Sequence, residues 1–323
     1  MEEKWSFDWR SDTLINCLKS LVFLRKVKET GFILFLILTL VSCISKENNI
    51  EKNYLSDKVP GKIPISFKPE LVPKNKIIHK GIFSPDLSHF FYTISDKNFS
   101  NFTVYTIRKK NGIWTKPEEA FFNSKYDEHG MSFSPDGNSL YFSSTRPVYI
   151  ENIASTWHIW KSEKINGEWT TPVYVDIPNL RKKLISHPTI SNSRTLYFHS
   201  SNLDYSEMEI YSSKLVKGKF QNAEKVPIPL YTDIAKCTPY ISPDEKFMIF
   251  ASIGDQLDLY ISYKDSFGNW SKTDRLNGTI NTYGQGNPYV TPDDKFLLYT
   301  VGRNNGEKWN VKWLNITSEL KND

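Results

Sequence analysis

Five polar residues near a repeated turn are those best suited to bind a ligand: Glu128, His129, His187, Arg146 and Arg303. Arg146 and Arg303 each lie twelve residues after the Ser or Thr that opens such a turn. Two guanidinium groups can hold an acidic ligand through bidentate hydrogen bonds. Simple surface ion pairing of the arginines is the alternative. We predict that the five residues form a ligand-binding site on one face of the folded domain.

A metal site is a competing interpretation of the histidines. His79 occupies nearly the same place in its repeat as His129 and His187, and imidazole is the commonest protein ligand of metals. However, His187 lies one residue closer to its turn, and the chain has no Cys-x-x-Cys spacing. We predict no metal ion and no other cofactor. The alternative for the histidines is that they are polar strand ends that face water.

Catalytic motifs give little support for an enzyme. Glycoside hydrolysis needs two carboxylates that converge on the substrate. The expected inner strands are the four residues before each turn, 130–133 in the second repeat, and none contains an Asp or Glu. Only Asp127 and Glu128 lie nearby. The sequence contains neither the Gly-x-Ser-x-Gly elbow of serine hydrolases nor a Gly-rich phosphate loop. We predict no catalytic residue. A glycan-processing enzyme of the glycoside hydrolase type stays the alternative.

A β-hairpin that occurs five times must position these side chains. Its turns open at Ser84, Ser134, Ser191, Ser242 and Thr291. In four copies a Pro and an Asp follow, which favour a tight turn because Pro restricts φ and Asp hydrogen-bonds nearby backbone. The third copy has Asn192 and Ser193 instead, which also form turns.

A second pattern lies between the hairpins and completes the repeat. A Gly-containing turn leads into an aromatic residue at Trp114, Trp169, Phe220 and Trp270. One repeat therefore predicts four antiparallel strands, a to d. The fifth repeat ends after strand c at residues 309–313, and residues 63–70 resemble the missing strand d. We predict that this N-terminal strand closes the ring of repeats and removes its exposed edges.

These residues resemble the WD40-like propeller repeat with a Ser-Pro-Asp-Gly signature, as found in TolB-type envelope proteins. The resemblance covers roughly residues 61–315 and implies an all-β fold, a β-propeller of four-stranded antiparallel blades over residues 61–323. The five hairpins predict five blades. TolB-type propellers usually have six, which stays the alternative count. The fold says little about function, because propellers host many unrelated activities.

The N-terminal region predicts export and lipid attachment. Residues 31–41 are mostly apolar but too few to span a bilayer comfortably, and basic residues precede them, as in a signal peptide. Leu40 to Cys43 resembles the bacterial lipobox, which implies acylation of Cys43 and a lipid anchor in the membrane. We predict a lipoprotein signal peptide at 1–43 and a flexible tether at 44–60. The protein would then lie in the bacterial cell envelope, on the periplasmic or surface side of the outer membrane.

The charge pattern bears on possible partners. The formal net charge is +5 without a clustered basic segment, which is weak for nucleic-acid binding. The b–c and d–a connections share one face and vary more than the hairpin turns of the opposite face, as functional loops tend to do. We therefore predict a monomeric, non-catalytic envelope lipoprotein that binds an unidentified protein or glycan through this variable face.

Overall fold

The computed structural model describes residues 54–56, 58–230, 234–254, 256–302 and 309–320. The chain divides into two compact units, Met1–Asp57 and Lys58–Asp323, of which the second forms the propeller. The predicted signal peptide, the acylation site Cys43, most of the tether and Arg303 lie outside the described residues. Within the described ranges, no helix is both long enough and apolar enough to cross a membrane.

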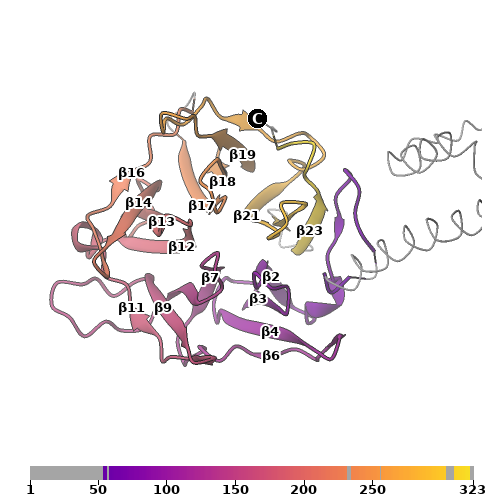
Figure 1. Ribbon diagram of the computed structural model, residues 1–323, viewed down its shortest axis with the longest axis horizontal. Helices are drawn as coiled ribbons and strands as arrows, with labels where there is room; N and C mark the ends of the chain where they lie inside the picture. The colour runs from indigo at the N-terminus through magenta and orange to yellow at the C-terminus, as the bar shows by residue number, and fades with distance from the viewer. Residues whose placement is uncertain (1–53, 57, 231–233, 255, 303–308, 321–323) are drawn as a thin grey trace, which may run out of the picture. The chain divides into compact units, whose positions relative to one another are not determined.

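Five antiparallel sheets surround a central channel as the blades of a β-propeller (Figure 1). Blade 1 contains β2 (Lys76–Phe83), β3 (His89–Asp96), β4 (Thr103–Lys110), β5 (Ile113–Trp114) and β6 (Glu118–Glu119). Blade 2 contains β7 (Glu128–Phe133), β8 (Ser139–Ser144), β9 (His158–Ile165), β10 (Glu168–Trp169) and β11 (Val173–Tyr174). Blade 3 contains β12 (Leu184–Ile190), β13 (Thr195–Ser201), β14 (Glu209–Val216), β15 (Lys219–Phe220) and β16 (Glu224–Lys225).

The last two blades follow the same plan. Blade 4 contains β17 (Ala235–Ile241), β18 (Phe247–Ile253), β19 (Leu257–Tyr263) and β20 (Asp274–Arg275). Blade 5 contains β21 (Gly284–Val290), β22 (Phe296–Gly302), β23 (Asn310–Asn315) and β1 (Ile65–Ser66). Two short 3-10 helices, η1 (Pro69–Leu71) and η2 (Pro178–Leu180), lie in connections. The all-β fold and the count of five blades are confirmed.

The outermost strand of blades 1 to 3 is broken into two short pieces. In blade 1, β5 and β6 both pair with β4, and Pro117 lies in the gap between them. Pro172 lies in the corresponding gap of blade 2. Proline has no N–H to donate to a sheet, so pairing is interrupted there at little cost on an outer edge.

The N-terminal strand closes the ring, as the sequence predicts. Ile65 in β1 pairs with Trp313 in β23, and the Phe67 N–H donates to the Val311 carbonyl at 2.8 Å. The Phe67 ring is buried, with its centroid 5.2 Å from that of Trp313 and 5.1 Å from that of Phe90 in blade 1. Because residues from both chain ends complete blade 5, its outer edge is covered and its core is joined to the first blade.

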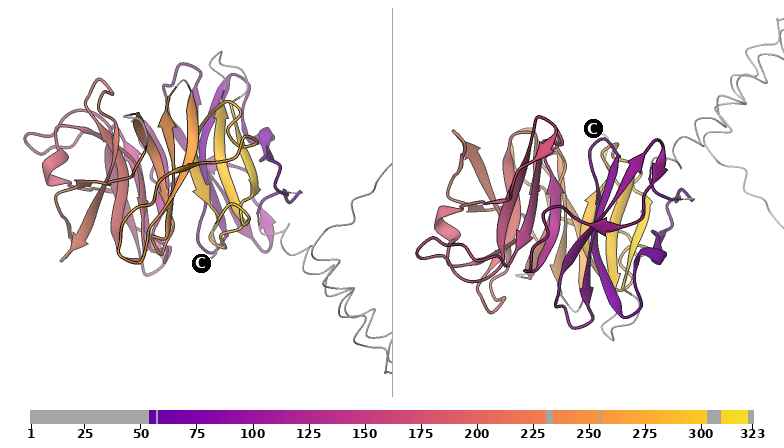
Figure 2. Two further views of the ribbon diagram at one scale, coloured as in Figure 1. Left: turned by 90° about the horizontal axis from the view of Figure 1, so that it is seen from above. Right: turned by 90° about the horizontal axis from the view of Figure 1, so that it is seen from below.

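The hairpin turns lie on one face of the propeller and the b–c and d–a connections on the other (Figure 2). In blade 1, the Ser84 hydroxyl donates to Asp86 at 2.5 Å, and Asp86 also accepts from the Ser88 N–H at 3.0 Å. Blade 2 repeats this arrangement with Ser134 and Asp136. These carboxylates therefore stabilise the turns themselves.

Blade 3 lacks this Asp, and the next blade supplies a carboxylate in its place. Glu245 of blade 4 accepts hydrogen bonds from the hydroxyls of Ser191, at 2.6 Å, and Tyr197, at 2.9 Å. The Lys264 ammonium pairs with Oε2 of Glu245, the same oxygen to which Tyr197 donates, at 2.6 Å. Burial alone would raise the pKa of Glu245, but the hydrogen bonds from Lys264, Ser191, Ser193 and Tyr197 outweigh it and hold the pKa at about 2. Glu245 therefore ties two blades together.

Replacing Glu245 by Gln is expected to lower the free energy of unfolding by about 2 kcal/mol at pH 7, because the amide cannot accept from Lys264 and three hydroxyls equally well. The lowered pKa means that this contribution is complete above pH 4.5 and is lost as the pH falls towards 2. Chemical denaturation at pH 7 and pH 3 measures it. The exposed Glu224→Gln is the control, and an effect of Glu245→Gln that is equal at both pH values would contradict this role.

Candidate functional site

A cavity of about 220 Å³ lies at the channel mouth on the face of the b–c and d–a loops. All five inner strands contribute to it, at the positions five and four residues before the turn Ser or Thr. The residues at these positions that line it are His79, Lys80, His129, Gly130, His187, Cys237, Thr238, Gly286 and Asn287. The cavity therefore collects one or two side chains from every blade around the propeller axis.

A β-bulge in each inner strand directs these residues into the channel. The register shifts between Ile78 and Gly81 in β2, and shifts occur at equivalent places in β7, β12, β17 and β21. Four bulge residues have a positive φ: Gly130, His187, Thr238 and Asn287. Such a bulge adds a residue and turns its side chain away from the regular alternation of a strand. The site thus depends on an irregularity that all five blades share.

A side chain at one of these positions would crowd the next blade. Gly130 has φ +63°, and a Cβ atom there would lie 3.2 Å from the Cα of His187 in the next blade. The missing side chain lets the neighbouring inner strand approach closely, which brings the His129 and His187 rings to a centroid distance of 4.5 Å. His129 and His187, predicted to share a site, do lie together in this cavity.

Aromatic side chains form the rim of the cavity. Phe99, Phe102 and Trp309 line it, all from b–c connections. Phe99 and Trp309 meet edge to face with ring centroids 5.4 Å apart. Trp157 stands next to the rim, with its ring 4.2 Å from that of His129. The mouth of the channel therefore presents apolar ring surfaces above a polar floor.

The histidines of the floor are connected through hydroxyl groups and backbone. The Ser186 hydroxyl lies 3.1 Å from both His129 Nε2 and His187 Nδ1. The His79 Nε2 lies 2.7 Å from the Ser95 hydroxyl. His199, behind His187, accepts a hydrogen bond from the Thr238 N–H at 3.2 Å through Nδ1, which places its own proton on Nε2 in the neutral form.

Burial keeps these imidazoles uncharged at neutral pH. It lowers the pKa of His79 to about 4 and that of His199 to about 3. The pKa values of His129 and His187 are also lowered well below the usual range, chiefly by burial and then by the positive charges of the neighbouring histidines and Lys80. A neutral imidazole offers one donor and one acceptor, which suits hydroxyl groups of a ligand.

Lys80 is the one Lys or Arg among the described residues that line this cavity. It is 3% exposed, and it also lines a second cavity of about 230 Å³ that lies towards the hairpin face. Burial lowers the pKa of Lys80 to about 7. None of the described residues lining either cavity is an Asp or Glu. The ammonium group therefore sits in the channel without a carboxylate partner.

Two amide side chains of blade 5 also have polar atoms without partners. Gln285 is fully buried, and neither its Oε1 nor its Nε2 forms a hydrogen bond. The Oδ1 of Asn287 is likewise buried without a donor. Both residues line the channel-mouth cavity. Buried polar atoms are normally satisfied, so these groups mark a place where a polar ligand or water would complete their hydrogen bonds.

Glu128 and Arg146, two of the predicted ligand-binding residues, pair with each other inside blade 2. Glu128 is 1% exposed, and its Oε1 lies 3.0 Å from Arg146 Nη2 and 3.1 Å from Arg146 Nε. Ser124 and Ser144 donate their hydroxyls to the same oxygen. The Arg146 guanidinium also donates to the Phe122 carbonyl. Neither Glu128 nor Arg146 lines the channel-mouth cavity, and a role in ligand binding stays a prediction for both.

The inner strands begin earlier than the sequence predicts. The expected strand of blade 2 began at Gly130, whereas β7 begins at Glu128, and the other inner strands likewise extend three or four residues further towards their start. The expectation that the inner strands contain no carboxylate is therefore wrong for blade 2. Its carboxylate nevertheless points into the blade, because side chains of successive strand residues alternate between faces.

The position of Glu128 is filled differently in the later blades. Lys236 of blade 4 occupies it and pairs with Glu209 at 3.0 Å, and Gln285 of blade 5 occupies it without a partner. Lys80, Asn287 and His199 were not singled out from the sequence. A comparison of the residues four places before each turn would have found two of them, because Lys80 and Asn287 are polar residues of buried strands.

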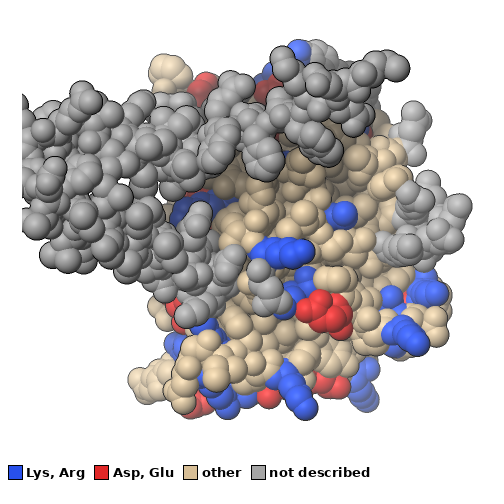
Figure 3. Space-filling model, turned by 90° about the vertical axis from the view of Figure 1, so that its right-hand side faces the viewer, with Lys and Arg blue, Asp and Glu red and all other residues tan. Residues whose placement is uncertain are grey.

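Other features of the described residues are less suited to bind a ligand. The described part of the chain has no group of three or more His, Cys, Asp or Glu residues that could hold a metal ion. Cys237 is a free, buried thiol whose pKa burial raises to about 12. Charged side chains of both signs are scattered over the described surface visible in Figure 3.

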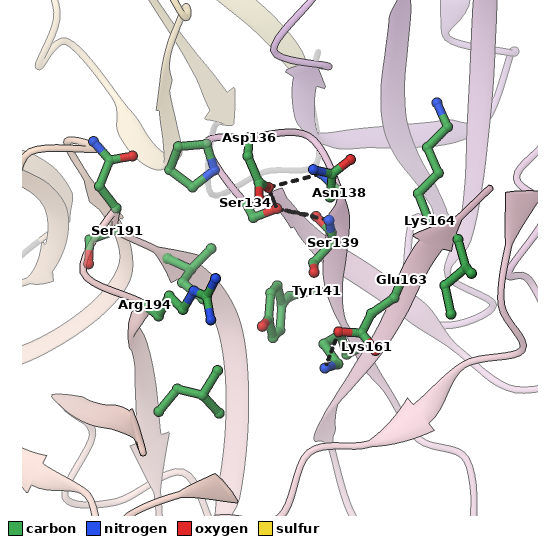
Figure 4. A pocket seen from close by; sticks show the side chains of 15 residues that line it. Ser134, Asp136, Asn138, Ser139, Tyr141, Lys161, Glu163, Lys164, Ser191 and Arg194 are labelled. Atoms are coloured by element: carbon green, nitrogen blue, oxygen red, sulfur yellow. Dashed lines mark hydrogen bonds and ion pairs between the residues drawn. The ribbon is translucent and has the colours of Figure 1, made fainter. Parts of the chain in front are cut away.

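A hollow of about 520 Å³ lies on the hairpin face between blades 2 and 3 (Figure 4). Tyr141 stands between Arg194 and Lys161 in this view. Most charged groups here already have partners: Lys161 pairs with Glu163 at 2.8 Å, and Ser134 donates to Asp136 at 2.5 Å. The hollow is therefore less suited to a specific ligand than the channel mouth, where polar groups lack partners.

The sheets and the channel define the chain as a five-bladed β-propeller. No protein-family model and no curated protein matches it. Among solved structures, TolB from Acinetobacter baumannii is 14% identical with a TM-score of 0.47, covering 73% of this chain and 54% of that one. A putative TolB from Agrobacterium tumefaciens is 14% identical with a TM-score of 0.49, covering 80% and 86%.

A thermostable family-43 glycoside hydrolase is 11% identical with a TM-score of 0.49, and the match covers 77% of this chain and 92% of that one. This chain spans about half the length of the Acinetobacter TolB chain. Similarity at these values carries no argument about activity or partners. The class of protein rests on the blades themselves, and its function has to be argued from the site.

Proposed function

We propose that this chain is a non-catalytic lipoprotein of the bacterial cell envelope, anchored through Cys43, whose propeller binds an envelope partner through the face of the b–c and d–a loops. The partner is a protein or a glycan, and the site favours a glycan. The observation that carries the proposal is the channel-mouth cavity, with unpartnered polar groups beneath an aromatic rim.

The composition of this cavity suits a sugar. Neutral imidazoles and the side-chain amides of Gln285 and Asn287 can exchange hydrogen bonds with hydroxyl groups. The rings of Phe99, Phe102 and Trp309 offer apolar surface to the C–H faces of a sugar ring. Sites for larger molecules usually have volumes of about 300–1,000 Å³, so a cavity of about 220 Å³ is matched to a single terminal sugar unit.

The same residues favour binding over turnover. Glycoside hydrolysis uses two carboxyl groups on opposite sides of the scissile bond, about 5–10 Å apart. The described lining of the cavity supplies imidazoles, amides, an ammonium group and aromatic rings. The two carboxylates adjacent in sequence to this lining, Glu128 and Asp258, are engaged with Arg146 and Arg275. A glycoside hydrolase stays the alternative, with turnover of a bound glycan as its distinguishing result.

The proposal is tested with a glycan array and a parallel pull-down from envelope extracts, using the full chain with Cys43→Ser to prevent acylation. We expect a glycan to bind and Trp309→Ala to weaken it about tenfold, which corresponds to about 1.4 kcal/mol. The matched control is Phe267→Ala, because Phe267 is an 89% exposed aromatic residue in a turn of the hairpin face. Loss of membrane association in Cys43→Ser relative to the native chain tests the anchor.

Three outcomes would contradict parts of this proposal. A reproducible protein partner without any glycan hit would show that the site does not serve a glycan. Equal effects of Trp309→Ala and Phe267→Ala would place binding away from the channel mouth. Release of a shortened product from the bound glycan would replace the binding function by the enzymatic alternative.

A further inference from the structure

We infer that the channel-mouth cavity is specific for an acidic sugar at the end of a glycan, whose carboxylate pairs with the ammonium group of Lys80. This inference rests on the proposed glycan-binding function and adds the class of ligand. It is carried by the isolation of Lys80 in the channel and by the amide atoms of Gln285 and Asn287 that lack partners in the same cavity.

Lys80 is a buried cation without a protein counter-charge. The side chain is 3% exposed, lies between the two channel cavities and makes no ion pair with a described residue. Removing an ammonium group from water costs several kcal/mol unless an opposite charge compensates it. A protein gains nothing in stability from such a residue, so its place in the channel calls for an anion from outside.

A second buried lysine of the same propeller shows the contrast. Lys236, also on an inner strand, is 6% exposed and pairs with Glu209 at 3.0 Å. Lys236 does not line the channel-mouth cavity, whereas Lys80 does. Lys236, away from the cavity, therefore has a carboxylate partner. Lys80, which borders the cavity, has none among the described residues.

The remaining groups of the cavity select a sugar acid over a simple anion. The imidazoles are uncharged at neutral pH, so among the described lining residues Lys80 alone supplies positive charge. Gln285 offers an unpartnered donor and acceptor, and Asn287 an unpartnered acceptor. A donor and two acceptors match the hydroxyl groups of a sugar, while a carboxylate on the same ring satisfies the ammonium.

The test is isothermal titration calorimetry at pH 6 with the full chain carrying Cys43→Ser. The probes are D-glucuronate and D-galacturonate, their neutral parents D-glucose and D-galactose, and disaccharides that end in each of these units. We expect the acidic probes to bind at least tenfold more tightly than the neutral ones, and the acidic disaccharides at least as tightly as the free acids. Tight binding of the free acids alone would overturn the assignment to a glycan end.

Variants of two lysines on β2 decide the role of Lys80. Lys80→Met is expected to reduce the affinity for acidic probes to that for neutral ones, and Lys80→Arg to keep a preference for the acids. Lys76→Met is the matched control, since Lys76 lies on the same strand but pairs at the surface with Asp96. Thermal melting verifies that each variant folds.

The failures can be told apart. Equal affinity for acidic and neutral sugars, or a preference that survives Lys80→Met, would overturn the role of Lys80 and leave glycan binding standing. Absence of binding by every sugar probe would overturn the acidic-sugar inference. The result of the glycan array would then decide separately whether the proposed function stands.

Discussion

Replacing Glu128 by Ala is expected to lower the free energy of unfolding by about 3 kcal/mol, since it leaves the half-buried Arg146 without its carboxylate. The carboxylate is 1% exposed and accepts from two nitrogens of Arg146 and from two serine hydroxyls. All four of these hydrogen bonds would be lost at once, and the guanidinium would keep only its bond to the Phe122 carbonyl. Chemical denaturation at pH 7, with circular dichroism as the signal, measures the change.

A double variant separates the loss of the ion pair from the loss of side-chain packing. Glu128→Leu combined with Arg146→Met removes both charges and is expected to recover at least 2 kcal/mol of the single-variant loss, because no buried charge is left unpaired. A single variant as stable as the native protein would contradict the buried ion pair. The double variant also tests the predicted ligand-binding role of Arg146: unchanged affinity for a ligand would remove Arg146 from the site.

Lys80→Met is expected to raise the free energy of unfolding of the ligand-free protein by about 2 kcal/mol at pH 6. Burial lowers the pKa of Lys80 from 10.5 to about 7. Between these values the unfolded chain binds more protons than the folded one, so the native protein gains stability as the pH rises. The advantage of Met is therefore greatest below pH 7 and shrinks as the pH approaches 10.5.

The described ionisable groups that face Lys80 titrate outside the pH range in which Lys80 itself changes its charge. The pKa values of its neighbours His79, His129, His187 and His199 lie below their usual range, because burial disfavours the imidazolium. Burial likewise raises the pKa of Cys237, across the cavity, to about 12, and raises that of Tyr240, towards the hairpin face. Stability curves of the native protein and of Lys80→Met at pH 6 and pH 9 make the comparison.

The exposed Lys76→Met is the control for this prediction, since its charge is largely in water. A loss of stability in Lys80→Met at pH 6 would show that the ammonium is well compensated in the folded protein, against both this prediction and the inferred ligand. A gain in stability together with a loss of affinity for acidic sugars would show that the chain retains Lys80 for binding and at the expense of stability.

The number and type of blades could be predicted from the sequence because they depend on local chemistry. Each hairpin is encoded by a turn of a few residues between two apolar runs, and the five turns are readily counted. Closure of the ring also follows from local pattern, since residues 63–70 carry the features of a strand d that the last repeat lacks. Successive connections of an antiparallel meander lie at alternate ends of its strands, and this shows which loops share a face of the propeller.

The location of the polar side chains was decided by the tertiary structure. His129 and His187 could be placed at the channel because they lie just before their turns. The directions in which the Glu128 and Lys80 side chains point could not be predicted. The bulges in the inner strands change the alternation of side chains, and no turn residue or charge pattern reveals these bulges in the sequence. One step along β7 separates Glu128, which faces into the blade, from His129, which faces the channel.

The repeat, the blade count and the strand that closes the ring could therefore be predicted without the structure, because a local pattern of residues marks each of them. Three features became visible only in the folded chain: Glu128 binds Arg146, Glu245 completes the turn of another blade, and Lys80 lies unpaired in the channel. Such pairings depend on how blades distant in sequence pack around one axis, and on which charges that packing removes from water.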